Sequence, residues 1–447
     1  MTLSKAAAAA AAVPLVLAAA AACGTSGGSS SSSSSAAPGT LTVWRAGAEV
    51  PAQDAWMNGV VAQFHRKNYP KFAKTKIKVD WVPFTTITQQ WQTALSTGKN
   101  APDVTEIGNT QTQGLASQGM LADISRDVNA WPSKDDLIPA DLANDLQNGK
   151  TYAVPWFGGF RGVWYHKSQF AAQHLTPPAS WAQLAGDAQK LQGAYPGTYG
   201  LGAPSEETNL IASFIWGAGG EIAVRHGGKW AGQLDTAPSQ AGIEFYAGLT
   251  TSYKVSPQQY IGETELGPKG STSGGANKDF ALGKLDMYMD GPWAAAQFDA
   301  IAAKNKADWA MFPLPGRSGG LAPVFSGGSD LGVWAGTKYS EAAWDLVRTM
   351  DSPANATSFA TAQNFYPPFS SQLTSHPVTG NPYLAALARA ASVAKIAPLN
   401  SVNWPVADDT DLIIPTMVKS LEQGASVAST VSRANTHLQD VLNTGQG

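Results

Sequence analysis

The sequence has little of what several classes of protein require. Its 447 residues contain one cysteine, Cys23, so no disulfide can form within the chain. The six histidines are scattered, and neither His-Glu-x-x-His nor Cys-x-x-Cys occurs, which argues against a metal site. The phosphate-binding pattern Gly-x-x-x-x-Gly-Lys-Ser/Thr is absent as well. We therefore expect no metal and no cofactor.

Charge is also scarce. Only 14% of the residues are charged, and the net charge is -3. A nucleic acid or an anionic lipid surface needs clustered lysine and arginine, so we expect neither as the main partner. Tryptophan, in contrast, is abundant at 15 residues, which suggests flat aromatic surfaces for a ligand.

Cys23 stands at the end of an apolar segment. Lys5 is followed by Val13–Leu17 and five alanines, and the polar tract after Cys23 includes seven consecutive serines, Ser29–Ser35. This order predicts a lipoprotein signal peptide over residues 1–22, with cleavage before Cys23 and acylation there. An ordinary signal peptide stays an alternative, because Ala20 stands where lipoprotein signals more often have a larger aliphatic residue. We expect the protein at the extracellular face of the cell membrane, lipid-anchored.

Residues 23–39 are rich in glycine and serine and predict a flexible tether. The remaining 400 or so residues are long enough for two or three hydrophobic cores. No second low-complexity linker divides them. Two lobes that share one continuous chain are therefore expected, rather than separate domains.

Strand and helix patterns alternate along this region. Residues 41–44, 77–81, 104–107 and 285–289 predict strands. Trp56, Val60 and Phe64 form one helical stripe, and Ser180 with Gln183 forms a capping box before a helix. A further helical face begins at Ala343 and ends near Asp351. The alternation favours an α/β fold with mainly parallel sheets, whose ligands bind beyond the carboxyl ends of strands.

Six segments resemble the extracellular solute-binding proteins of carbohydrate ABC importers, the family that includes maltose-binding protein. The segments are Ala101–Gly108, Gly149–Pro155, Gly162–Lys167, Pro178–Trp181, Met287–Trp293 and Ser326–Val333. A weaker resemblance, in Asp103–Gln111 and the lipid anchor, is to actinobacterial receptors for chitobiose and other disaccharides.

This resemblance implies the two-lobed periplasmic-binding-protein type II fold, with a hinge and a ligand cleft between the lobes. The matching segments imply chain crossings near residues 154–157, 289–291 and 331–337. Lobe one would then hold residues 40–154 and 290–332, and lobe two residues 155–289 and 333–447. The implied partners are a di- or oligosaccharide and the permease subunits of an importer whose ATPase is a separate chain. We expect a monomer.

A sugar has C–H faces that aromatic rings cover and hydroxyls that planar polar groups bind. Aromatic residues near Gly or Pro and polar residues after predicted strands are therefore the candidates. They are Glu49, Asn109, Gln111, Trp156, Phe157, Trp216, Asp290, Trp293, Gly328, Tyr366 and Trp404.

Each candidate has a plainer interpretation. Glu49 could cap the next helix, Asn109 and Gln111 could be turn residues, and Asp290 could brace a hinge. Paired glycines such as Gly327-Gly328 often serve turns. Trp81, Trp181 and Trp344 fall on apolar stripes and are expected in the core.

An enzyme is the competing class, most plausibly a secreted carbohydrate hydrolase that uses a carboxylate pair. Glu206-Glu207 and Asp408-Asp409 are adjacent pairs, but sequence neighbours usually point apart, so they read as solvated turns. The serine-hydrolase pattern Gly-x-Ser-x-Gly is absent. We therefore expect a binding protein without catalytic residues. A structural or adhesive surface protein is a third class, and it would not require a hinge.

Overall fold

The computed structural model describes residues 39–47, 51–264, 275–396 and 401–445. The predicted signal peptide, Cys23, nearly all of the tether and Glu49 lie outside the described residues. In the described part, no helix combines the length and the apolar character needed to cross a membrane.

The described strands and helices alternate along the chain, as expected. The strands are β1 (Thr40–Ala46), β2 (Lys76–Val82), β3 (Val104–Gly108), β4 (Leu146–Gln147), β5 (Lys150–Thr151), β6 (Ala153–Gly159), β7 (Gly162–His166), β8 (Ala223–His226), β9 (Lys229–Gly232), β10 (Met287–Asp290), β11 (Trp309–Pro313) and β12 (Gly327–Val333). The α-helices are α1 (Pro51–Lys67), α2 (Phe84–Thr97), α3 (Thr112–Ser117), α4 (Ser125–Asn129), α5 (Pro139–Asn144), α6 (Lys167–Ala172), α7 (Trp181–Ala194), α8 (Thr208–Gly217), α9 (Ala237–Thr251), α10 (Gly275–Ala281), α11 (Ala294–Ala302), α12 (Ser340–Met350), α13 (Pro353–Ala362), α14 (His376–Thr379), α15 (Pro382–Leu387), α16 (Ile413–Glu422) and α17 (Val427–Asn443).

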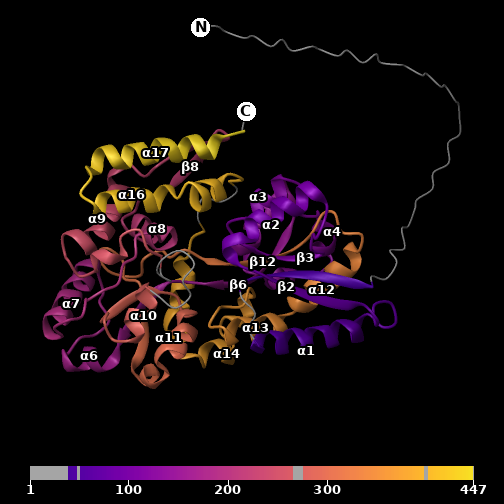
Figure 1. Ribbon diagram of the computed structural model, residues 1–447, viewed down its shortest axis with the longest axis horizontal. Helices are drawn as coiled ribbons and strands as arrows, with labels where there is room; N and C mark the ends of the chain where they lie inside the picture. Colours follow the sequence, from indigo (N-terminus) through magenta and orange to yellow (C-terminus); the bar gives the residue numbers. More distant parts are fainter. Residues whose placement is uncertain (1–38, 48–50, 265–274, 397–400, 446–447) are drawn as a thin grey trace, which may run out of the picture. The chain divides into compact units, whose positions relative to one another are not determined.

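The first sheet has the strand order β2-β1-β3-β12-β6. Figure 1 labels four of these strands, β2, β3, β12 and β6. β1 pairs in parallel with β2 and β3, and β12 is antiparallel to both β3 and β6. Four of its strands therefore run in one direction and β12 runs against them. The chain leaves β6 at Gly159, and β12 enters at Gly327, which pairs with Gly159, so the two strands must run oppositely.

The second sheet has the order β10-β7-β11, and both pairings are antiparallel. The prediction of mainly parallel sheets is therefore wrong for this sheet. β7 follows directly from the first sheet and is inserted between β10 and β11, which are connected through α11. In each sheet one strand therefore runs against its neighbours: β12 in the first sheet and β7 in the second.

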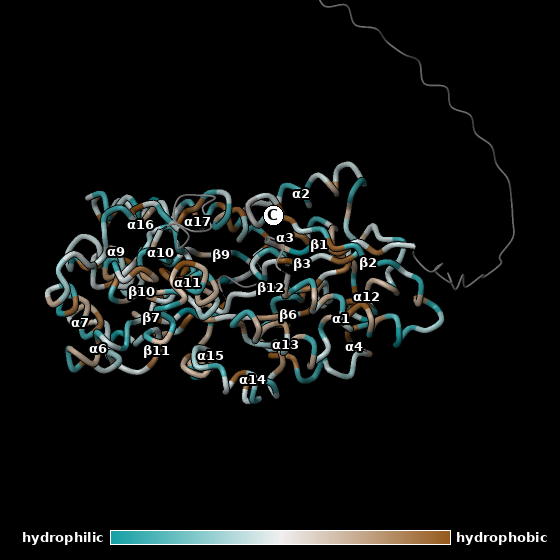
Figure 2. Tube along the Cα trace, turned by 60° about the horizontal axis from the view of Figure 1, so that its bottom comes forward, coloured by the Kyte–Doolittle hydropathy of each residue, from teal (hydrophilic) through white to brown (hydrophobic). Residues whose placement is uncertain are grey.

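The strands of the first sheet are hydrophobic along much of their length (Figure 2), and their buried residues fall into two clusters, one with Leu41 and Val43 and one with Trp44 and Ala46. α1 packs on this sheet through Val60 and Phe64, both fully buried, as the predicted stripe requires. α12 packs on it through Leu346 and Val347. Trp344 is buried in the same cluster, whereas Trp81 is only half-buried.

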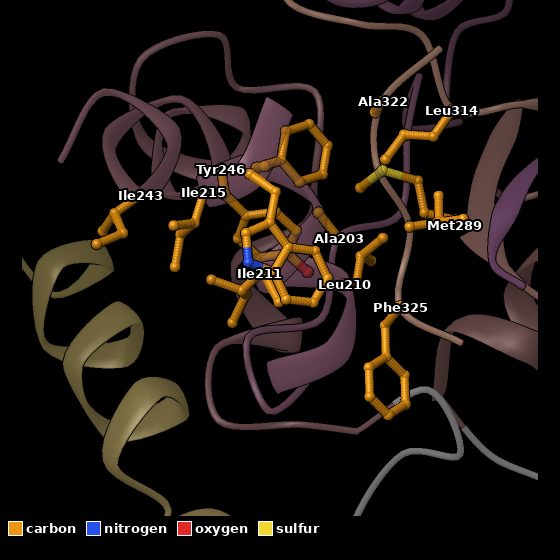
Figure 3. Close-up of a cluster of buried hydrophobic side chains, with 14 of the residues drawn as sticks. Ala203, Leu210, Ile211, Ile215, Ile243, Tyr246, Met289, Leu314, Ala322 and Phe325 are labelled. Atoms are coloured by element: carbon orange, nitrogen blue, oxygen red, sulfur yellow. The ribbon is translucent and has the colours of Figure 1, made fainter. Parts of the chain in front are cut away.

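A separate set of clusters surrounds the second sheet. One of them contains α8, α9 and residues near β10 and β11, among them Ile211, Tyr246 and Met289 (Figure 3). Trp181 is buried there at the start of α7, as predicted. The Ser180 hydroxyl accepts a hydrogen bond from the Gln183 backbone N–H at 3.3 Å, which confirms the predicted cap.

The chain passes between the sheets at places that differ in part from the sequence-based expectation. Phe160 and Arg161 connect β6 to β7, close to the expected crossing at residues 154–157. Asp290-Gly291-Pro292 does not leave the second sheet, because it turns into α11, whose Phe298 packs with Tyr288 of β10. The return lies at residues 325–326, just before β12. Residues 294–324 therefore pack with the second sheet, and α12 and α13 with the first.

Four aspartates, one of them Asp330 in β12, lie close together in the part of the chain that packs with the first sheet. Asp145, Asp330 and Asp351 are buried, with 3% of the side chain or less exposed, and Asp141 faces them. Burial raises the pKa of Asp330 to about 7 and that of Asp141 to about 6. Burial, with the nearby Asp330, also raises the pKa of Asp145 well above its usual range. Two carboxyls buried this close together repel each other when both are ionised, which favours a protonated form for one of them.

We expect the free energy of unfolding to fall as pH rises from about 4 to 8. Carboxyls whose folded-state pKa lies above the ordinary 3.8 bind more protons when folded, so their stabilising effect is lost as pH rises through the folded-state pKa. Urea unfolding at pH 5, 6, 7 and 8 measures the slope of the unfolding free energy against pH. Each carboxyl that is protonated only in the folded state contributes about 1.4 kcal/mol per pH unit to this slope. Asp145→Asn should flatten it. An unchanged slope in that variant, or greater stability at pH 8 than at pH 5, would contradict the raised pKa values of these aspartates.

Candidate ligand-binding site

A cavity of about 460 Å³ lies at the edge of the first sheet where β1, β3 and β6 end and β12 begins. This is the edge at which ligands were expected. The lining also includes Gln53 of α1, Asn209 of α8, Trp293 just before α11, and residues that follow α13. The lining residues are Arg45, Ala46, Gly47, Gln53, Glu106, Gly108, Asn109, Thr110, Phe157, Arg161, Asn209, Trp293, Phe325, Gly327, Gly328, Ser329, Gln363 and Phe365.

A buried ion pair joins the ends of β1 and β3 in this lining. Arg45 Nε donates to Glu106 Oε2 at 2.8 Å, and the side chains are 3% and 2% exposed. The same oxygen accepts the backbone N–H of Ala46 at 3.0 Å. The guanidinium carbon also lies 4.4 Å from the Trp156 ring and 4.7 Å from the Phe359 ring. Two hydrogen bonds and two ring faces offset the cost of burying these charges.

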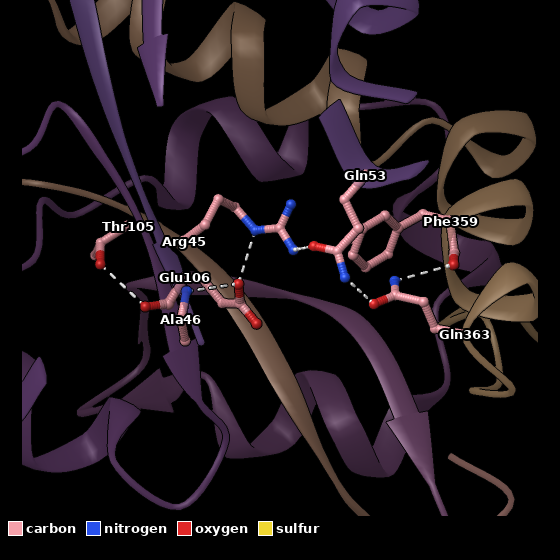
Figure 4. A network of polar contacts seen from close by, with 7 residues as sticks. All are labelled: Arg45, Ala46, Gln53, Thr105, Glu106, Phe359 and Gln363. Atoms are coloured by element: carbon pink, nitrogen blue, oxygen red, sulfur yellow. Dashed lines mark hydrogen bonds and ion pairs between the residues drawn. The ribbon is translucent and has the colours of Figure 1, made fainter. Parts of the chain in front are cut away.

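Amide side chains continue from this ion pair along the cavity (Figure 4). Arg45 Nη2 donates to Gln53 Oε1 at 3.1 Å. The Gln53 amide nitrogen donates to Gln363 Oε1, and Gln363 Nε2 donates to the carbonyl of Phe359 at 3.2 Å. Each of the two amides accepts one hydrogen bond and donates one, which fixes which way its oxygen and nitrogen point before any ligand arrives.

Aromatic rings form a continuous row beside these polar groups. Trp293 is stacked on Phe365, with centroids 5.3 Å apart and an interplanar angle of 16°. Phe365 contacts Phe157 at 4.7 Å, and Phe157 contacts Phe359 at 5.6 Å. Phe359 is stacked on Trp156 at 4.2 Å. Trp293, Phe365 and Phe157 line the cavity, whereas Trp156 is fully buried behind it.

Two glycines leave the space that the indole of Trp293 occupies. A Cβ on Gly159 would lie 2.6 Å from the indole, and one on Gly291 would lie 2.1 Å from it. Both distances are shorter than a carbon–carbon contact allows, so only glycine lets the ring lie where it does.

A second ion pair lies at the Trp293 end of the row. Arg161 Nη2 is 3.2 Å from Glu207 Oε2, and the guanidinium carbon lies 5.3 Å from the indole centroid. Burial, with Asp409 next to it, raises the pKa of Asp408 to about 7, although Thr208 and Arg161 lower it.

The structure brings four of the predicted site residues together at the cavity: Asn109, Phe157, Trp293 and Gly328. The Asn109 side chain donates to the Ser326 carbonyl at 3.0 Å, so part of its amide already has a partner. Gly328 has a backbone role, because a Cβ there would lie 2.1 Å from the carbonyl of Phe157.

The other predicted residues of the described part lie elsewhere. Gln111 faces away and donates to Asp409 at 3.0 Å. Asp290 is fully buried and accepts the backbone N–H of Gly291. Trp156, Trp216, Tyr366 and Trp404 are buried, each at most 5% exposed. Their place beside Gly or Pro predicted loops, but the indole and phenol rings pack inward and belong to the core.

Sequence reasoning missed the polar groups of the cavity: Arg45, Gln53, Glu106, Arg161, Asn209 and Gln363. One signal was available. Arg45 and Glu106 are opposite charges near the ends of two otherwise apolar strands, and such charges are rarely buried unless they pair. In the described residues, no group of three or more His, Cys, Asp or Glu side chains could hold a metal ion.

Comparisons with known proteins agree with this fold. The pattern of the family described as bacterial extracellular solute-binding protein matches residues 47–357. The chain is 27% identical over 396 residues to the diacetylchitobiose binding protein DasA of Streptomyces coelicolor. The aligned region covers 87% of this chain and 86% of that protein.

Solved structures resemble it as well. The GacH receptor of Streptomyces glaucescens has a TM-score of 0.77 at 22% identity, over 91% of this chain and 99% of that one. The sugar-binding protein MalE of Xanthomonas citri has a TM-score of 0.75 at 20% identity, over 90% and 97%. These likenesses show the α/β, two-lobed periplasmic-binding-protein fold. The family pattern covers more than half of the sequence, and the chain belongs to the bacterial extracellular solute-binding proteins.

Proposed function

We propose that this protein is the receptor of an ABC importer and that it binds a di- or oligosaccharide in the 460 Å³ cavity. The observation that carries the proposal is the lining itself. Phe157, Phe365 and Trp293 offer flat apolar faces next to the charged and amide groups of Arg45 and Gln363. Such a surface suits the C–H faces and hydroxyls of a sugar. The volume lies in the usual range of small-molecule sites, about 300–1,000 Å³.

The relatives support a sugar as the ligand class. DasA is described as a diacetylchitobiose binding protein, and the GacH receptor was solved in complex with acarbose. None of the described relatives is an enzyme, so the carbohydrate-hydrolase alternative has no support from them.

For the lobes, we propose that residues 39–159 and 327–369 form one and residues 162–324 and 376–445 the other, following the sheets and their cores. A sugar bound to one lobe would favour closure by adding contacts to the second lobe. The closed form would present both lobes to the permease. The proposed lipid anchor at Cys23 would keep the receptor near it.

A thermal-shift screen tests the function. The panel is N,N′-diacetylchitobiose, cellobiose, maltose, trehalose and xylobiose. A ligand at 100 times its Kd should stabilise the folded state by about 2.7 kcal/mol, which raises the melting temperature. Calorimetry with the best ligand should show saturable heat, and chromatography of the mixture should show no product. Cleavage of the sugar would favour the hydrolase, and the absence of any shift would contradict the proposal.

Trp293→Ala should weaken the binding of the best ligand by about 2 kcal/mol, because it removes the aromatic face at one end of the row. Isothermal calorimetry measures the change. Tyr69→Ala is the matched control, since Tyr69 is 78% exposed and does not line the cavity. If both variants bind as tightly as the wild type, Trp293 is not part of the site.

Cys23→Ala should release the protein from the membrane fraction into the medium, because the variant has no thiol to acylate. Cell fractionation followed by immunoblotting measures the distribution, with Ser29→Ala as control. Membrane association of the variant that persists in high salt would contradict the lipid anchor.

A further inference from the structure

The arginines that line the cavity are each neutralised inside the protein. Arg45 is paired with Glu106 at 2.8 Å, and Arg161 with Glu207 at 3.2 Å. All four side chains are at most 12% exposed. Of the described lining residues, only Arg45, Glu106 and Arg161 have ionisable side chains. The described part of the lining is therefore polar, and each of its charged side chains is paired with an opposite charge.

Among the described lining residues, a charged ligand would find no unpaired counter-charge. An ionised group that leaves water needs an opposite charge and hydrogen bonds, or it loses much of its solvation energy. A carboxylate on the sugar would also face Glu106, and an ammonium group would face the two arginines. An uncharged sugar meets neither penalty, because hydroxyl groups can both donate and accept.

Glu106 differs from the other charged groups in how its oxygens are used. Oε2 accepts both Arg45 Nε and the Ala46 backbone N–H. In the described part of the chain, those two bonds are the hydrogen bonds of its carboxylate, and neither uses Oε1. A carboxylate oxygen is a strong acceptor for a hydroxyl. The carboxylate cannot turn away easily, because Arg45 is itself held by Gln53, and Gln53 by Gln363 (Figure 4).

We propose that Glu106 determines the specificity of the site: Oε1 accepts ligand hydroxyl groups, and the pairing with Arg45 restricts the cavity to uncharged saccharides. This inference rests on the proposed function and narrows its ligand class. Gln53 and Gln363 are then positioning residues, which act through Arg45 on the orientation of the carboxylate.

Matched sugars test the inference on the wild-type protein. The pairs are maltose with maltobiouronic acid, cellobiose with cellobiouronic acid, and N,N′-diacetylchitobiose with chitobiose. Within the pair that binds, calorimetry at pH 6 should give the neutral sugar at least about a tenfold lower Kd than the charged one. Equal or tighter binding of the charged member would overturn the inference while the proposed function stands. If neither these sugars nor the screen of neutral saccharides gives binding, both are wrong.

Two variants separate the roles of Glu106. Glu106→Gln keeps the shape of the side chain but leaves Arg45 without its counter-charge. It should bind the neutral sugar at least about tenfold more weakly and should shift the neutral-to-acidic affinity ratio toward the uronic acid. Glu106→Asp keeps the charge but shortens the reach, so it should lose affinity and keep the ratio.

Glu341→Gln is the matched control, because Glu341 pairs with Lys71 on the surface, 52% exposed. It should change neither the affinity nor the ratio. Thermal melts of all variants report folding separately. If Glu106→Gln lowers the melting temperature while both affinity and ratio stay at wild-type values, Glu106 has only a structural role and the inference is wrong. If that variant does not fold, Glu106→Asp and the wild-type sugar pairs still decide the question.

Discussion

The pairing of β12 with β3 and β6 is the constraint on which the arrangement of the cavity depends. This strand comes from late in the chain, after the second sheet, and runs against its neighbours in the first sheet. It brings Gly327, Gly328 and Ser329 to the ends of β3 and β6. Without this insertion, the loops after β1 and β3 would have no wall facing them. A long-range pairing of this kind must form before a site exists at all.

The cavity combines two kinds of surface that normally compete for the same space. Buried charges need partners, and aromatic rings need apolar neighbours. Arg45 satisfies both requirements. Its guanidinium lies against the rings of Trp156 and Phe359, and its Nε–H donates a hydrogen bond to Glu106. The rings shield the guanidinium from water, and its charge attracts their faces. The polar part of the lining is thus already ordered by the protein, which reduces what a ligand must organise on binding.

Local patterns in the sequence predicted most of the individual elements, because burial periodicity is a local property. The strands at β1, β2 and β3, the stripe of α1 and the cap of α7 could all be read directly. The direction of β7 and β12 could not, since it depends on which sheet a strand joins. The same limit explains the site. Asn109 and Trp293 follow strands and lie in the cavity, whereas Gln53 and Gln363, separated by 310 residues, meet only through tertiary structure.

The candidate tryptophans show why residue type alone could not decide the site. Trp156, Trp216 and Trp404 have the same neighbours in sequence as Trp293, namely glycine or proline, yet their rings fill cores. Trp293 differs in the two glycines against its ring, Gly159 and Gly291. An indole that lies against backbone at two such positions has little room to turn. The side chain of Trp293 therefore loses its rotational entropy when the protein folds. A ligand that stacks on the ring then incurs little further loss of side-chain entropy at that contact.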